Sequence, residues 1–388
     1  MDKIDELLTR GVEEIIDKKD LETVLRSKKK LRIKLGIDPT SPNIHIGRAT
    51  LLLKLREFQE LGHTAIFIVG DFTGLVGDTS DKDSERPMLT ESLVKKNMRG
   101  YFDQAYKILD KKKTEVHYNS KWLKKLGFIE LAKMANLFGL HEFESREVIA
   151  RRMQAGGRVS FTELLYPLMQ GYDSVAVRAD VELGGTDQRF NLLTGRRLQM
   201  LYNQKPQNIL MMGILEGTDG RKMSSSWGNV INIADEPNDM FGKVMSINDG
   251  LIKKYFVLAT RVPIEEIERV ISANANPRDQ KLVLAEGITR LYHGEKKAAE
   301  AKLAFINQFS KGDLPEKMPA KKITAGNHDL IELLVGTGLV SSKSEARRLV
   351  EQNGVKVNQE PCKEKVLKKI EGQDLVLQVG KRKFIRLY

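Results

Sequence analysis

Several features are scarce or missing in this chain of 388 residues, and each absence excludes a class of protein. A single cysteine, Cys362, excludes a fold held by internal disulfides and suits a reducing cytosol. No stretch approaches the roughly 18 apolar residues of a membrane-spanning helix, and the N-terminal MDKIDELLTRGVEEII is too acidic for a secretory signal. We therefore expect a cytoplasmic protein without a membrane span.

Positive charge is present in excess, and it is unevenly distributed. The chain has 64 Lys and Arg against 52 Asp and Glu, a net charge of +12. Residues 321–388 contain 14 Lys and Arg against 8 Asp and Glu, which is +6, half of the total. A basic segment of this kind favours a polyanion as its partner.

The hydrophobic pattern predicts an α/β fold. An apolar run over 31–37 indicates a buried strand, a helix follows Arg48 and ends at Gly62, and 65–69 indicates a second strand. This strand–helix–strand order argues for a parallel sheet covered by helices. Further short strands are predicted over 116–118, 180–185 and 208–215, and one or two helices over 1–30.

Composition also predicts three domains. We expect a Rossmann-like catalytic domain over 1–227, with a helical insertion over about 100–172. An α-helical domain follows over 228–320, closing with a linker from Gly312 to Lys322 that contains two prolines. Residues 321–388 form a small α+β domain with a helix over 339–350 and strands over 354–358 and 374–378.

The stretch GIDPTSPNIHIGRAT, residues 36–50, joins the first predicted strand to its helix. It places His45 and Gly47 at a helix N-terminus, where free N–H groups and the helix dipole attract phosphate. Taken alone, a His before a helix is more often a simple helix cap. In parallel sheets, however, ligands bind beyond the carboxyl ends of the strands, from which this loop leaves.

The loop after the second strand, VGDFTGLVGDTSDKDSERP, also leaves from that edge. It has no Walker pattern. Asp78 can accept a hydrogen bond from an α-ammonium group, and Lys82 and Arg86 can close over a triphosphate. A solvated surface loop is the alternative.

Three polar residues share one face of a mainly apolar helix. Tyr166, Gln170 and Asp173 are spaced by four and three residues in LLYPLMQGYDS. Buried polar groups need a hydrogen-bonding partner, which is either another side chain or a substrate.

Two further motifs and the tail complete the pattern. LGGTDQ, residues 183–188, pairs two approachable glycines with a helix cap, and GRKMSSS, residues 220–226, puts a lysine and hydroxyls in a loop. The tail carries Arg347 and Arg348 on a capped helix, and contacts from such cations to phosphates would give salt-sensitive affinity for a polyanion.

In this order the motifs resemble those of class I aminoacyl-tRNA synthetases of the tyrosyl type. HIGR is similar to their HIGH signature, KMSSS to KMSKS, and the tail to the S4 RNA-binding module. The resemblance implies activation of L-tyrosine with ATP and Mg²⁺ to tyrosyl-adenylate and pyrophosphate, and transfer of tyrosine to the 3′ end of tRNA(Tyr). It also implies a homodimer.

The resemblance further implies a role for each residue. The implied catalytic residues are His45, Arg48, Lys82, Arg86 and Lys222. The implied ATP-binding residues are Gly36, Asp38, Thr40, His45, Gly47, Gly184, Gly185, Asp187, Met223, Ser224 and Ser225. The implied tyrosine-binding residues are Asp78, Tyr166, Gln170, Asp173 and Gln188, and the implied RNA-binding residues are Lys343, Arg347, Arg348 and Lys356; no protein ligands to a metal are implied.

Three positions depart from the family pattern. Arg48 stands where the second His of HIGH is expected, although Arg can also donate to phosphate. Ser225 stands at the second Lys of KMSKS. Lys34 replaces a second tyrosine-binding Tyr that many tyrosyl enzymes have.

Three alternatives remain at this point. A tryptophanyl-tRNA synthetase shares the fold and both signatures, but Asp173 and the S4-like tail argue against it. A HIGH-type nucleotidyltransferase such as a pantothenate ligase would lack the helical domain and the RNA module. A non-catalytic RNA-binding relative would need a degenerate active site, which only Arg48 and Ser225 indicate.

Overall fold

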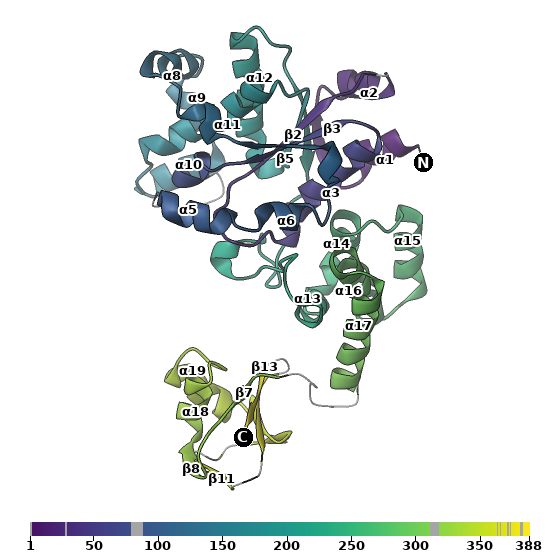
Figure 1. The fold of residues 1–388 in the computed structure, drawn as a ribbon, viewed down its shortest axis with the longest axis vertical. Coiled ribbons are helices and arrows are strands. Elements are labelled where there is room, and N and C mark those ends of the chain that lie inside the picture. The colour runs from purple at the N-terminus through teal and green to yellow at the C-terminus, as the bar shows by residue number, and fades with distance from the viewer. Residues whose placement is uncertain are drawn as a thin grey trace. The chain divides into compact units, whose positions relative to one another are not determined.

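The structure is a computed structural model. It describes residues 2–27, 29–78, 88–310, 318–362, 364, 366–370, 372, 374–380 and 383–388. The chain forms two compact units, residues 1–303 and 304–388 (Figure 1). No helix in the described parts is both long and apolar enough to span a bilayer. The predicted domain boundaries at 227 and 320 stay predictions.

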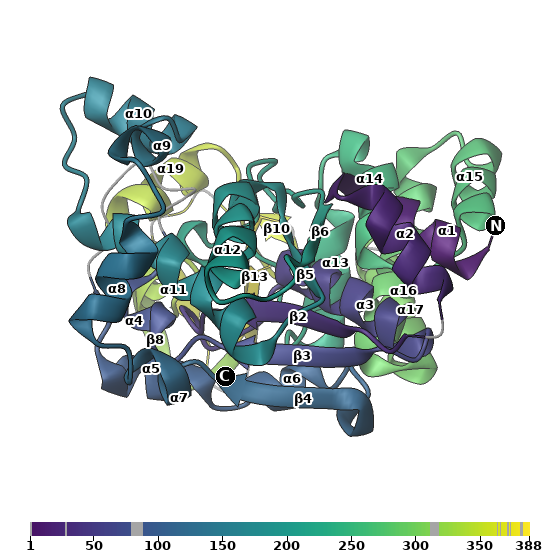
Figure 2. The same ribbon diagram turned by 90° about the horizontal axis from the view of Figure 1, so that it is seen from above.

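A six-stranded sheet in the order β1-β6-β5-β2-β3-β4 forms the centre of the first unit. Its parallel strands are β2 (Arg32–Ile37), β3 (Thr64–Val69), β4 (Thr114–Tyr118), β5 (Val181–Gly185) and β6 (Asn208–Met212). Figure 2 shows five of them side by side in that order. The predicted parallel α/β fold is therefore confirmed. The chain adds β3 and β4 on one side of β2 and β5 and β6 on the other, so the strand order reverses between β2 and β5, where such sheets bind ligands.

The two helices predicted over residues 1–30 are confirmed, but the prediction missed a strand between them. Helices α1 (Lys3–Thr9) and α2 (Lys18–Arg26) flank a strand, β1 (Val12–Ile16), which pairs antiparallel with β6 at the sheet edge. Gly11 and Asp17 bound the strand with positive φ angles of 66° and 67°. The sequence VEEII hides the strand because two adjacent glutamates interrupt the alternation of a half-buried strand.

Helices cover both faces of the sheet. Figure 1 shows α11 (Phe161–Val177) and α12 (Arg189–Leu201) on one face and α3 (Ile46–Glu60) and α6 (Tyr101–Ala105) on the other. Strand β3 alternates accordingly, because Ile66 and Ile68 pack with Val177, whereas the ring of Phe67 meets Phe102.

The rest of the first unit is helical. The remaining helices before β5 are α4 (Thr73–Val76), α5 (Glu91–Met98), α7 (Ser120–Leu123), α8 (Phe128–Ala135), α9 (Leu140–Glu144) and α10 (Glu147–Gln154). Those after β6 are α13 (Pro237–Met245), α14 (Ile252–Ala259), α15 (Ile264–Ala273), α16 (Pro277–His293) and α17 (Glu295–Ser310). The predicted helical character of 228–310 is thus confirmed.

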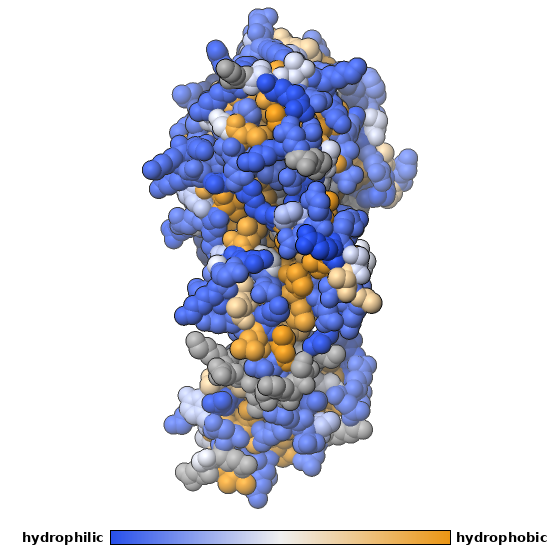
Figure 3. Space-filling model, turned by 90° about the vertical axis from the view of Figure 1, so that its right-hand side faces the viewer, coloured by the Kyte–Doolittle hydropathy of each residue, from blue (hydrophilic) through white to orange (hydrophobic). Residues whose placement is uncertain are grey.

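Polar and charged residues cover most of the face drawn in Figure 3.

The second unit is a small α+β fold, as predicted. Its helices are α18 (Leu330–Gly336) and α19 (Lys343–Glu351). Its strands are β7 (Ala320–Lys321), β8 (Gly326–Asp329), β9 (Val355–Val357), β10 (Glu360–Pro361), β11 (Val366–Lys369), β12 (Leu375–Val379) and β13 (Lys383–Leu387). The linker prediction was wrong at its end, since β7 pairs with β13; residues 312–317 lie outside the described residues.

Two glycines let α11 and α12 approach closely. A Cβ on Gly171 would lie 3.1 Å from the backbone nitrogen of Gly195 and 3.0 Å from Cδ1 of Leu198. These distances are shorter than ordinary van der Waals contacts, and a backbone atom cannot move aside easily. The close packing of α11 against α12, two helices next to the cavity described below, therefore depends on the absence of a side chain at Gly171.

We predict that Gly171→Ala lowers the free energy of unfolding, although alanine is the better helix former by about 1 kcal/mol. The matched control is Gly242→Ala in α13, where a Cβ meets no atom within 4 Å, so the same change should stabilise the protein. Urea unfolding of both variants checks this. Equal stability gains in the two variants would contradict it.

Candidate active site

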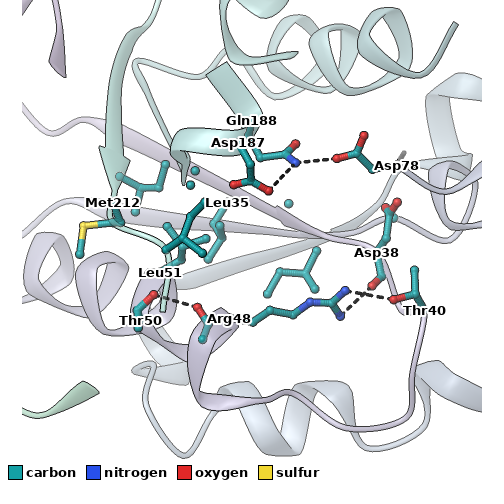
Figure 4. Close-up of a pocket in the computed structure, with 18 of the residues that line it drawn as sticks. Leu35, Asp38, Thr40, Arg48, Thr50, Leu51, Asp78, Asp187, Gln188 and Met212 are labelled. Atoms are coloured by element: carbon teal, nitrogen blue, oxygen red, sulfur yellow. Dashed lines mark hydrogen bonds between the residues drawn. The ribbon is translucent and has the colours of Figure 1, made fainter. Parts of the chain in front are cut away.

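A cavity lies at the carboxyl ends of β2 and β5 (Figure 4). It is lined by all the predicted catalytic, ATP-binding and tyrosine-binding residues that the structure describes, namely Gly36, Asp38, Thr40, His45, Gly47, Arg48, Asp78, Tyr166, Gln170, Asp173, Gly184, Gly185, Asp187, Gln188, Lys222, Met223, Ser224 and Ser225. Lys82 and Arg86 lie outside the described residues. The sheet thus brings five separate sequence motifs together, while the role of each residue stays a prediction.

His45 begins α3 as its N-cap. Its Nδ1 accepts a hydrogen bond from the backbone N–H of Arg48 at 3.3 Å. Burial lowers the pKa of His45 well below its usual value, and the charges of Arg48 and Lys222 lower it further. His45 is therefore a neutral imidazole at physiological pH.

Arg48 is held against the loop that precedes it. Its guanidinium donates to the carbonyl of Asp38 at 3.2 Å, to Tyr101 Oη at 3.1 Å and to Thr40 Oγ1 at 3.0 Å. Figure 4 shows the bond to Thr40. In this structure Arg48 therefore supports the loop, and its predicted catalytic role stays a prediction.

Asp38 accepts two short hydrogen bonds at the end of β2. Thr73 Oγ1 donates to its Oδ1 at 2.6 Å, and Tyr166 Oη donates to its Oδ2 at 2.8 Å. Burial raises the pKa of Asp38 to about 6 despite these donors. Gly70 must lack a side chain here, because a Cβ would lie 2.0 Å from Asp38 Oδ1.

Asp173 lies at the inner end of the polar face of α11 and is 4% exposed. Trp122 Nε1 donates to its Oδ1 at 2.7 Å, and Asn119 Nδ2 donates to its Oδ2 at 3.1 Å. Burial raises the pKa of Asp173 to about 7. The sequence prediction missed both donors. Their position directly after β4, at the carboxyl edge of the sheet, was the available signal.

The glycine pair that ends β5 leads into Asp187 and Gln188. A Cβ on Gly185 would lie 2.4 Å from Asp187 Oδ1, so a side chain here would displace the carboxylate of Asp187. Gln188 Nε2 donates to Asp78 Oδ2 at 2.5 Å, as Figure 4 shows. Asn191 Nδ2 joins Gln188 to Gln170 by donating to both side-chain oxygens, at 3.0 and 3.1 Å.

The GRKMSSS loop closes the cavity from the other side. Lys222 Nζ forms an ion pair with Asp187 Oδ2 at 2.8 Å, and Ser225 Oγ donates to Ser41 Oγ at 3.2 Å. Met223 Sδ accepts from the N–H of Gly47 at 3.4 Å. The two signature-like loops therefore contact each other directly.

The predicted RNA-binding residues lie in the second unit. Lys343, Arg347 and Arg348 are exposed on α19, and Lys356 is half-buried on β9. Lys343 forms an ion pair with Glu332 at 3.0 Å. The surface is basic and ordered, and its binding role stays a prediction.

Comparison with known proteins gives consistent matches over nearly the whole chain. A family profile described as "tRNA synthetases class I (W and Y)" matches residues 26–310, and one described as "Tyrosine--tRNA ligase SYY-like C-terminal domain" matches residues 310–387. A tyrosine–tRNA ligase of Thermotoga maritima is 46% identical over 98% of this chain and 96% of its own length. One of Colwellia psychrerythraea is 46% identical over 98% of this chain and 97% of its own.

This chain belongs to the tyrosine–tRNA ligase family. Solved structures agree on the fold. The mitochondrial tyrosyl-tRNA synthetase of Aspergillus nidulans has a TM-score of 0.67 at 22% identity, covering 79% of this chain and 94% of its own. The enzyme of Archaeoglobus fulgidus, solved with L-tyrosine, has a TM-score of 0.62 at 23% identity, covering 78% of this chain and 100% of its own.

We predict a pH-dependent stability cost from Asp173. Its pKa is about 7 in the fold, above its ordinary value of 3.8, so the folded carboxyl keeps a proton that the unfolded one has lost between pH 4 and 7. The free energy of unfolding of the wild type should therefore fall relative to Asp173→Asn as pH rises through this window, by up to about 1.4 kcal/mol per pH unit. Urea unfolding at several pH values measures the difference. A difference that does not change with pH would contradict the prediction.

Proposed function

We propose that this chain joins L-tyrosine to tRNA(Tyr) in two steps at the cavity. The tyrosine carboxylate attacks the α-phosphorus of ATP, which releases pyrophosphate and forms tyrosyl-adenylate. A ribose hydroxyl of the terminal tRNA adenosine then attacks the acyl carbon and releases AMP. The observation that carries this proposal is the juxtaposition of a buried carboxylate on α11 with two loops similar to the HIGH and KMSKS signatures.

The inner part of the cavity fits the tyrosine side chain. Asp173 accepts the phenolic O–H, while Tyr166, Gln170 and Asp78 surround the α-ammonium group and Gln188 faces the carboxylate. A pocket whose polar groups are paired by a substrate hydroxyl rejects a substrate that lacks it, because those groups are left unpaired. The degree to which tyrosine is preferred over phenylalanine for this reason is known from measurements in this enzyme family.

The mouth of the cavity fits ATP. The backbone of Gly36, Gly47, Gly184 and Gly185 can approach the nucleotide closely, and Asp187 offers an acceptor for the ribose. The N-terminus of α3 and the cations around it are placed where negative charge develops on the phosphates. No side-chain nucleophile is required, since the substrate supplies its own, and the enzyme acts by alignment.

Mg²⁺ would enter with ATP. The ion usually keeps several waters and binds phosphate oxygens with one or two carboxylates. Among the described residues no group of three or more His, Cys, Asp or Glu is placed to hold a metal ion. When bound, Mg²⁺ shields the charge of the pyrophosphate group.

We further propose that the reaction takes place in the cytoplasm.

The second unit supplies a surface for tRNA. The exposed cations of α19 with Lys356 would contact phosphates, which gives affinity that falls steeply with salt and depends little on sequence.

We predict tyrosine-dependent ATP–pyrophosphate exchange without tRNA, and none with tryptophan or phenylalanine. Asp173→Ala should lower kcat/KM for tyrosine about 10- to 100-fold, since a hydrogen bond to a charged group contributes about 1.5–3 kcal/mol. Exchange with tryptophan would favour a tryptophanyl enzyme. No exchange with any amino acid, in a folded protein, would overturn the enzyme assignment and leave RNA binding by the second unit.

We also propose a homodimer, because neighbouring helices expose large apolar side chains. Phe128 and Ile129 of α8 are 89% and 73% exposed, and Leu140 of α9 and Phe161 of α11 are exposed as well. We predict that Phe128→Lys with Ile129→Lys converts a dimer to monomers in sedimentation analysis. The control is Leu303→Lys on α17, an exposed leucine elsewhere, which should remain dimeric. A monomeric wild type would contradict the proposal.

A further inference from the structure

A buried ion pair adjoins the cavity: Glu182 lines the cavity, and Lys34 lies behind it. Lys34 is fully buried on β2, two residues before Gly36, and Glu182 is 1% exposed on the neighbouring strand β5. Lys34 Nζ donates to Glu182 Oε1 at 2.7 Å, to Ser174 Oγ at 2.8 Å and to the carbonyl of Gln170 at 2.9 Å. All three hydrogens of the ammonium group therefore have acceptors.

Glu182 is equally well satisfied. Its Oε2 accepts from Ser174 Oγ at 2.9 Å and from the side-chain amide of Gln207. Gly195 on α12 leaves room for this arrangement, since a Cβ there would lie 2.8 Å from Gln207 Nε2 and 3.3 Å from Glu182 Oε2. The pair is thus enclosed by β2, β5, α11 and α12.

Stability alone does not account for such a pair. Removing two charges from water costs several kcal/mol per ion, and replacement of a buried pair by apolar residues is often neutral or stabilising. The position of the pair is more informative. Lys34 bonds to the residues of α11 on either side of Asp173, the carbonyl of Gln170 and the hydroxyl of Ser174.

The groups around Asp173 show how Lys34 affects the protonation of this carboxyl. Trp122 and Asn119 donate to it as neutral groups, and Tyr166 on the same helix is neutral because burial raises its pKa well above 10. Lys34 lowers the pKa of Asp173, while Glu182 raises it by less. Lys34 is the cation that opposes the desolvation of this carboxylate.

We propose that Lys34 is a positioning residue for amino-acid selection, whose ammonium group, oriented by Glu182, favours the ionised form of Asp173 as the acceptor for the phenolic O–H of tyrosine. This inference rests on the proposed function. The specificity determinant thus extends one layer below the cavity wall.

The test is the double variant Lys34→Met/Glu182→Gln, which removes both charges and leaves no unpaired ion. At pH 7 we expect the KM for tyrosine in pyrophosphate exchange to rise about fivefold, because raising a pKa of about 7 by one unit lowers the ionised fraction at pH 7 from about one half to about one tenth. The preference for tyrosine over phenylalanine in kcat/KM should fall similarly, and the KM for ATP should not change. At pH 8.5 the tyrosine defect, relative to wild type at the same pH, should shrink as Asp173 ionises.

The matched control is Lys54→Met/Glu57→Gln. Lys54 is also a buried lysine, paired with Glu57 at 2.6 Å on α3, and it does not line the cavity. This variant should keep the wild-type preference for tyrosine. A folded Lys34→Met/Glu182→Gln variant with wild-type selectivity, or with a defect that does not respond to pH, would overturn the inference. A wild type that shows no exchange with tyrosine would instead overturn the proposed function itself.

Discussion

The burial of carboxylates at one edge of the sheet is the constraint on which the site depends. Asp173 and Asp38 each need donors that remain in place without water. Asn119 donates to Asp173 and to Thr73, Thr73 donates to Asp38, and Tyr166 donates to Asp38 from the other side. One hydrogen-bonded chain therefore links the ends of β2 and β4 to α11, and it preorganises both acceptors before substrate arrives.

The arrangement of charged groups assigns the proposed binding of the amino acid and that of the polyphosphate to different parts of the cavity. Buried anions lie at the inner end of the cavity, where the cost of an unpaired group is high. The cations Lys222 and Arg48 lie toward the α3 terminus and the GRKMSSS loop, where a polyphosphate would bind. Under the proposed function, the amino acid would be recognised where the environment is least aqueous, and the charge developing on phosphate would be met where cations and helix N–H groups converge.

The sequence predicted the parts of the site that are determined locally. A strand, a glycine and a helix cap are encoded within a few residues, so the loop at His45 was predicted at the correct edge of the sheet, and the loops at Gly184 and Lys222 were predicted to follow strands. The strand β1 was missed because its pairing with β6 involves residues about 200 positions away. The contacts of Lys34 were missed for the same reason, since Ser174 and Glu182 lie 140 and 148 residues further along the chain. The sequence showed that Lys34 departs from the family pattern, but it did not show which residues Lys34 contacts.

The two departures in the signature motifs balance each other electrostatically. Relative to the family pattern, Arg48 adds a permanent cation where a neutral histidine is expected, and Ser225 removes one from the facing loop. These two changes together leave the number of cations at these signature positions the same as in the family pattern. The difference is that one cation lies on a helix, at Arg48, and not on the facing loop, at Ser225. The bonds of Arg48 to Asp38, Thr40 and Tyr101 hold this charge at a fixed position. A charge that is already oriented needs no reorganisation when negative charge develops, so the exchange of a loop lysine for a helix arginine is compatible with the proposed chemistry.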